Sequence, residues 1–184
     1  RSASFDDLPL GSSLLQESFL ANEEAARDAI EGQEVALANY EAWGRVMGYQ
    51  ALYASGDGDI FILGTELYRD SAGAHDAFAW YPSQMSAEDY FTQSVAAAFA
   101  GEMFAIEGVL VSAARISFPR LGDESGAWKV QIGGDLAPLT MYSVGLRVGR
   151  AGGVATLAAE PGQEALVRLE DLATRLSAKM AESL

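Results

Sequence analysis

Apolar and polar residues follow one another in a pattern that predicts a sheet of about six strands. Residues 45–54 and 60–69 are rich in β-branched, aromatic and other apolar residues, and the turn-forming segment Ser55-Gly56-Asp57-Gly58-Asp59 separates them. This arrangement is typical of a β-hairpin. Further strands are predicted over residues 109–118, 127–132, 140–148 and 154–159, with glycine or proline residues between them.

Apolar residues spaced three and four apart predict helices before, between and after these strands. The expected helices begin at Asn22, Gln33, Asp70, Ser86 and Pro161, and they end near Gly32, Gly44, Pro82, Met103 and Met180 respectively. On the last of them, the pairs Glu164–Arg168 and Asp171–Arg175 stand at the favourable i,i+4 spacing.

The order of elements is therefore a helical stretch interrupted at Gly32, two strands, two helices, four strands and a last helix. Strands joined by short turns pair antiparallel, so we predict an α+β fold in which an antiparallel sheet is flanked by helices. No linker or shift in composition divides the chain, and we expect residues 1–184 to form a single domain. Residues 1–21 show no period and are expected to be an irregular N-terminal segment.

Composition and charge exclude several classes of function. The 184 residues are 49% hydrophobic, which is typical of a globular chain, and they carry a net charge of −14. A surface so acidic repels phosphate backbones, so nucleic acid is not an expected partner. The absence of cysteine excludes disulfides, thiolate nucleophiles and zinc–thiolate sites. No apolar run is long enough to predict a transmembrane segment.

His75 is the only histidine and the first candidate for catalysis. It follows Ser71 by four residues on a predicted helix, and a Ser–His pair with Asp70 or Asp76 could begin a hydrolase site. A nucleophile, however, has to approach the imidazole from a separate rigid element, and no G-x-S-x-G motif is present. We therefore interpret His75 as a surface histidine.

Two glycine-containing segments are candidates for an ion site or a phosphate site. Asp57 and Asp59 alternate with glycines, but the calcium-loop pattern that ends in a glutamate is absent. Gly149, Gly152 and Gly153 do not match a phosphate-binding loop, and a turn between two strands explains them better. The sequence thus predicts no catalytic residue, no metal site and no cofactor.

Aromatic residues are the remaining candidates for a binding site. Tyrosines and tryptophans with polar tips line many small-molecule pockets, but they also fill ordinary cores, and both interpretations stay open here. The candidate ligand-binding residues are Trp43, Tyr49, Tyr68, Trp80, Tyr81 and Trp128. Trp80-Tyr81-Pro82, at a predicted helix end, is the first segment to examine for an exposed patch.

Several short segments resemble a set of uncharacterised secreted or lipoprotein-type bacterial domains. They are Trp43-Gly44-Arg45-Val46-Met47-Gly48-Tyr49, Leu67-Tyr68 followed by Ala72-Gly73-Ala74, Leu121-Gly122-Asp123-Glu124-Ser125, and Val148-Gly149-Arg150. The layout of the whole chain also resembles the Mog1/PsbP-like α/β/α sandwich. Members of that fold are binding or scaffolding modules, so the resemblance implies no shared catalytic residues.

Taken together, these observations predict a non-enzymatic extracytoplasmic module that binds an unknown small molecule or protein. The chain begins at Arg1 without a methionine, which suggests an upstream signal or lipid-anchored leader, although a cytoplasmic location stays open. One alternative is a small-molecule enzyme that uses carboxylate and tyrosine chemistry in a deep pocket. Another is a structural domain that binds a partner through an exposed apolar patch.

Overall fold

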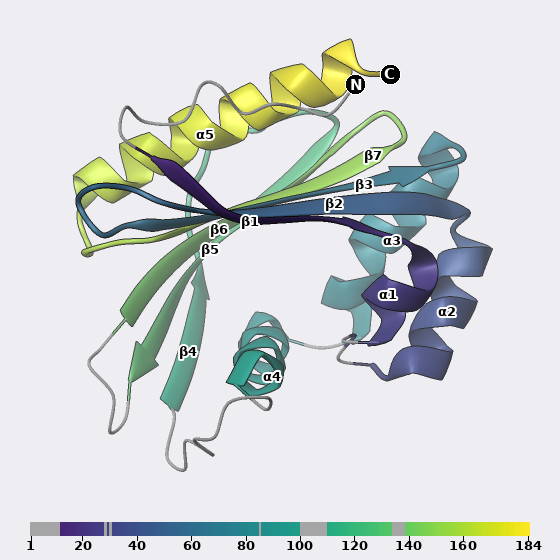
Figure 1. The fold of residues 1–184 in the computed structure, drawn as a ribbon, viewed down its shortest axis with the longest axis horizontal. Coiled ribbons are helices and arrows are strands. Elements are labelled where there is room, and N and C mark those ends of the chain that lie inside the picture. The colour runs from purple at the N-terminus through teal and green to yellow at the C-terminus, as the bar shows by residue number, and fades with distance from the viewer. Residues whose placement is uncertain (1–11, 28, 30, 85, 100–109, 134–138) are drawn as a thin grey trace.

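In the described part of the chain, the computed structural model shows a seven-stranded antiparallel sheet and five helices (Figure 1). The structure describes residues 12–27, 29, 31–84, 86–99, 110–133 and 139–184. The strands are β1 (Ser13–Leu20), β2 (Arg45–Ala54), β3 (Ile60–Tyr68), β4 (Leu110–Arg115), β5 (Glu124–Gly133), β6 (Leu139–Val148) and β7 (Ala151–Ala158). The helices are α1 (Asn22–Arg27), α2 (Gln33–Ala42), α3 (Ser71–Gln84), α4 (Ala87–Phe99) and α5 (Gln163–Glu182). The predicted α+β class is confirmed.

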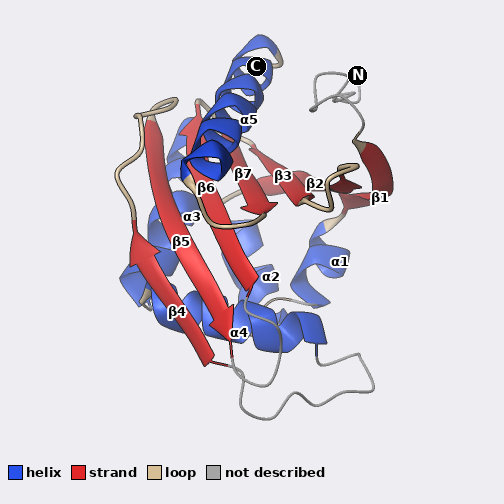
Figure 2. Ribbon diagram, turned by 90° about the vertical axis from the view of Figure 1, so that its left-hand side faces the viewer, coloured by secondary structure: helices blue, strands red, loops and turns tan. Residues whose placement is uncertain are grey.

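The strands pair in the order β1-β2-β3-β7-β6-β5-β4, so β1 and β4 are the two edges (Figure 2). All six predicted strands are present, and the seventh, β1, corrects the expectation that residues 1–21 are irregular. Residues 13–20 escaped prediction because most of their side chains are exposed on both faces, which leaves no alternation of apolar and polar positions. Residues 1–11 lie outside the described part of the chain.

One face of the sheet packs against α5, which contacts β6 and β7. The register places Phe61 opposite Leu157 and Leu63 opposite Ala155, and all four side chains are fully buried. The α5 residues that complete this core are Leu169, Leu172, Ala173, Leu176 and Met180. Burying one large apolar side chain stabilises a fold by about 1.5–3 kcal/mol, so this layer is a main source of stability.

The opposite face carries the remaining helices (Figure 1). Tyr40 and Trp43 from the α2 region, Tyr68 at the end of β3, and Ala74 and Ala77 from α3 form a second buried cluster. A third, smaller cluster lies under α4, where residues of β4 and β5 pack together. Helices therefore cover both faces of the sheet, as the α/β/α layout predicts.

Two expectations about the helices are wrong in detail. Pro82 does not end α3, which continues to Gln84, because a proline in the last turn removes only one backbone hydrogen bond. Arg168 contacts Asp59 in the β2–β3 turn, where the buried carboxylate needs a cation, and no ion pair with Glu164 forms. The predicted i,i+4 pair between Arg175 and Asp171 is present, with 2.9 Å between Nε and Oδ2.

Candidate functional site

Five of the six predicted ligand-binding aromatics have described side chains, and these lie in different clusters. Trp43, Tyr68 and Trp80 belong to the cluster between the sheet and helices α2 and α3, and the rings of Trp43 and Trp80 are 5.8 Å apart. Trp43 and Tyr68 are only 9% and 3% exposed, so these rings fill a core. Trp128 packs elsewhere, 6.4 Å from the ring of Phe91 on α4.

Tyr49 and Tyr81 are the other two candidates. Tyr49 lies at the β1 side of the sheet, where its ring is 5.0 Å from that of Phe19. The side chain of Tyr81 lies outside the described residues. Trp80, the one aromatic of the Trp80-Tyr81-Pro82 segment whose side chain is described, is half-buried. The structure does not gather the five candidates whose side chains are described into one pocket.

A buried arginine joins the first aromatic cluster to the strands. The guanidinium of Arg45 donates through Nε to Glu66 Oε1 (2.8 Å) and through one terminal nitrogen to Asn22 Oδ1 (2.9 Å). It also lies 4.7 Å from the centre of the Tyr40 ring, a cation–π contact. Tyr68 donates its hydroxyl proton to the other oxygen of Glu66 at 2.6 Å. These contacts compensate the buried charge and fasten α1 and α2 to β2 and β3.

The tyrosines of this network are held in their protonated form. Burial, with the nearby negative charge of Glu66 as the next cause, raises the pKa of Tyr40 to about 12. The same two causes, in the same order, raise the pKa of Tyr68 further. A phenol with a raised pKa is a weaker acid and stays protonated at neutral pH, so these groups serve as hydrogen-bond donors and packing surfaces.

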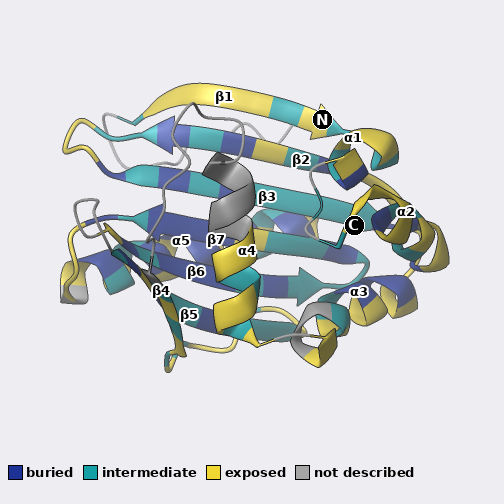
Figure 3. Ribbon diagram, turned by 90° about the horizontal axis from the view of Figure 1, so that it is seen from below, coloured by how far each residue is buried: buried dark blue, intermediate teal, exposed yellow. Residues whose placement is uncertain are grey.

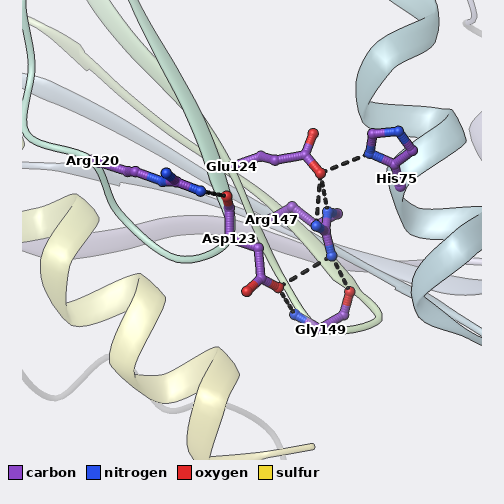
Figure 4. Close-up of polar contacts among 6 residues, drawn as sticks. All are labelled: His75, Arg120, Asp123, Glu124, Arg147 and Gly149. Atoms are coloured by element: carbon purple, nitrogen blue, oxygen red, sulfur yellow. Dashed lines mark hydrogen bonds and ion pairs between the residues drawn. The ribbon is translucent and has the colours of Figure 1, made fainter.

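His75 takes part in a second polar network, which joins α3 to the start of β5 and the end of β6 (Figure 4). Its Nδ1 lies 2.7 Å from Glu124 Oε1, and the same oxygen accepts from Arg147 Nε at 2.8 Å. Arg147 also donates to Asp123 Oδ2 (3.1 Å) and to the carbonyl of Gly149 (2.8 Å). His75 is 56% exposed, as predicted for a surface histidine.

The charges in this network hold Glu124 ionised. Burial alone would raise the pKa of Glu124, but hydrogen bonds from His75 and Arg147 and the positive charge of Arg147 outweigh it and lower the pKa. An acid with a lowered pKa, hydrogen-bonded to His75 and Arg147, neither donates a proton readily nor attacks a substrate. The network therefore links helix α3 to strands β5 and β6.

The hairpin aspartates likewise have structural roles. Asp59 is buried, its backbone N–H donates to Ser55 Oγ at 3.1 Å, and its carboxylate is paired with Arg168. The neighbouring Asp57 is exposed. Within the part of the chain that the structure describes, no group of three or more histidine, aspartate or glutamate side chains could hold a metal ion.

Apolar side chains are exposed along the β1 edge, by which we mean strand β1 together with Tyr49 of β2. Leu14, Leu15 and Phe19 are 47%, 57% and 56% exposed, and Figure 3 shows β1 exposed along most of its length. Val46 and Met47, also exposed, extend this apolar surface at the start of β2. An edge strand presents unpaired backbone N–H and C=O groups to solvent, so polar and apolar contacts are both available here.

A polar contact fixes the middle of the β1 edge. The Tyr49 hydroxyl donates to Glu17 Oε2 at 2.8 Å, while its ring packs against Phe19. Burial and this hydrogen bond raise the pKa of Tyr49, so the phenol remains a donor. Sequence reasoning named Tyr49 but missed Glu17 and Phe19. The available signal was three large apolar residues, Leu14, Leu15 and Phe19, within a segment without periodicity.

No family model matches the chain, and a search of curated proteins finds no similar sequence. Among solved structures, the chain is similar to the extracellular domain of PknH from Mycobacterium tuberculosis. The TM-score is 0.51 at 7% sequence identity, over 92% of this chain and 86% of that one. Identity this low shows likeness of fold alone. The Mog1/PsbP-like resemblance is not confirmed by these comparisons and stays a prediction. None of the helices in the described ranges has the length and hydropathy needed to cross a membrane.

Proposed function

We propose that this chain is a non-enzymatic extracytoplasmic module that binds a protein partner along the β1 edge. The observation that carries the proposal is the exposure of Leu14, Leu15 and Phe19 on a strand at the edge of the sheet. Natural edge strands are commonly protected by charge, proline or brevity. Here eight residues contain a single charged side chain, Glu17.

The extracytoplasmic part of the proposal is supported by the similarity in fold to a domain that is extracellular in its own protein. Secretion and a lipid anchor on an upstream segment would both present the β1 edge outside the cell membrane. The non-enzymatic part is supported by the two polar networks, because each engages its acids and phenols in contacts between helices and strands. Among the hypotheses from sequence, the exposed apolar surface favours partner binding over small-molecule chemistry.

The test uses a displayed library of extended peptides and two matched variants. Phe19→Ser removes the exposed ring of the β1 edge, while Val167→Ser alters a residue of α5 that is equally exposed, at 57%. Aromatic side chains at the centre of an interface commonly contribute more than 1.4 kcal/mol, so peptides selected on the natural chain should bind Phe19→Ser about tenfold or more weakly. Binding to Val167→Ser should be unchanged.

Circular dichroism and thermal melting establish that both variants are folded. A library that yields no binders, or binders indifferent to the Phe19 substitution, would show that β1 is not a binding edge. The proposal would also fail if the chain turned over a small molecule and one point substitution in a polar network abolished that turnover.

A further inference from the structure

The register of β1 against β2 determines which β1 side chains lie on each face of the sheet. Glu17 lies opposite Ala51 and Phe19 opposite Tyr49, so Glu17 and Phe19 share the face that carries α5. A register shift between Leu14 and Gln16 interrupts the ladder, and from Gln16 to Leu20 the pairing is regular. A strand added outside β1 would therefore have five regular positions to pair with.

The negative charge around β1 favours certain side chains in an added strand. Residues 13–42 include seven aspartates or glutamates and one arginine. The glutamates Glu17, Glu23, Glu24, Glu34 and Glu41 are exposed in β1 and in helices α1 and α2. Helix α1 contacts both β1 and β2, so its acids stand at the C-terminal end of the edge. This field attracts cationic segments and repels acidic ones, including a second copy of a chain with net charge −14.

We propose that the β1 edge takes up an extended cationic segment of a partner protein as an eighth, antiparallel strand. This inference rests on the proposed function and names the partner's chemistry. An antiparallel strand matches every other pairing in the sheet. Its residue opposite Phe19 is aromatic or β-branched, and its residue two positions later, opposite Glu17, is lysine or arginine.

The spacing of paired residues in a sheet accounts for both preferences. Directly opposite side chains in a sheet have Cβ atoms about 4.5–5.5 Å apart, close enough for an aromatic pair with Phe19 and an ion pair with Glu17. Tyr49 holds Glu17 by donating to its Oε2, so the carboxylate is positioned before the partner arrives. A carboxylate accepts several hydrogen bonds, so this contact leaves capacity for a cation.

The experiment compares two synthetic ten-residue peptides that are threonine-rich strands with a central Tyr-Thr-Arg or Tyr-Thr-Glu. We expect the arginine peptide to bind the natural chain about fivefold more tightly than the glutamate peptide at low salt, since attraction and repulsion both contribute. Glu17→Lys should abolish or reverse this preference. Glu170→Lys, on an exposed position of α5, changes the net charge equally and should preserve it.

Hydrogen–deuterium exchange then locates the peptide. Amides within Gln16–Leu20 should become protected when the arginine peptide binds, because an added strand pairs with the outward N–H groups. Equal affinity for the two peptides, protection confined to another part of the chain, or concentration-dependent dimers that bury β1 in light scattering would each overturn the inference.

Different experimental results would refute the proposed partner chemistry and the proposed function. Selected peptides that depend on Phe19 but lack the aromatic-x-cation pattern would refute this partner chemistry while leaving the proposed function intact. Peptide binding that is indifferent to Phe19 would refute the proposed function itself.

Discussion

Gly73 in the first turn of α3 offers the sharpest test of the packing between helix and sheet. Its backbone N–H donates to Asp70 Oδ1 at 2.9 Å, and the residue is buried against the turn that joins α2 to β2. A Cβ added at Gly73 would lie 1.9 Å from the carbonyl oxygen of Trp43 and 2.8 Å from its carbonyl carbon. Gly73→Ala therefore forces one backbone segment away from another by about 1 Å.

Two opposing effects set the magnitude. Alanine is a better helix former than glycine and would stabilise α3 by up to about 1 kcal/mol. Overpacking costs roughly 1–3 kcal/mol, and the upper end applies here because backbone atoms, not a flexible side chain, stand in the way. The turn is also constrained, since Gly44 has a φ of 64° and its carbonyl accepts from Arg69 N at 2.9 Å. We expect a net loss of about 2 kcal/mol.

The loss is measured by urea denaturation and thermal melting. For a domain of this length, 2 kcal/mol corresponds to a fall in Tm of roughly 4–8 °C. Gly56→Ala is the control, because nothing lies within 4 Å of its added Cβ and its φ is not positive. That variant should stay within about 0.5 kcal/mol of the natural chain. A Gly73→Ala protein that melts at or above the natural temperature would show that the contact with Trp43 is not tight.

Two further substitutions test the core under α5 and the polar network of His75, Glu124 and Arg147. Leu157→Ala, at a fully buried position under α5, should lower the free energy of unfolding by about 2–5 kcal/mol in urea denaturation; a loss below 1 kcal/mol would contradict the packing described. Glu124→Gln should cost roughly 1 kcal/mol at neutral pH. Because the folded-state pKa of Glu124 is lowered from 4.5, its contribution is present above that pH and is lost as the pH falls through the lowered value. The two unfolding curves should therefore converge in acid, whereas a difference that persists or grows there would contradict the ion pairing.

Local patterns made most of the secondary structure predictable. Periods of two and of 3.6 residues are properties of short segments, so the hairpin of β2 and β3 and the amphipathic α5 could be identified without knowledge of their neighbours. β1 could not be identified in this way, because it is the partner strand β2 that stabilises it and its own side chains remain exposed. Edge strands with little burial carry little periodic signal.

The candidate sites were less predictable than the strands. Tyr49 and Tyr68 belong to adjacent strands and look equivalent in the sequence, yet Tyr49 shares a face with Phe19 and Tyr68 packs with Trp43. Register decides between the two faces, and a shift of one residue would exchange them. Aromatic composition alone therefore could not show which rings fill a core and which lie at an edge.

The chain's own residue pattern determines the fold class, six of the seven strands and the acidic surface, because hydrophobic periodicity and charge are properties of local sequence. The pairing of β3 with β7, the Asp59–Arg168 contact and the His75–Glu124 contact depend on tertiary structure. Each joins residues 49 or more positions apart, and such contacts form only when burial of the apolar faces has brought distant segments together. The exposure of the β1 edge also depends on tertiary structure. In the assembled sheet β1 pairs with β2 on one side, and no described strand pairs with its other side.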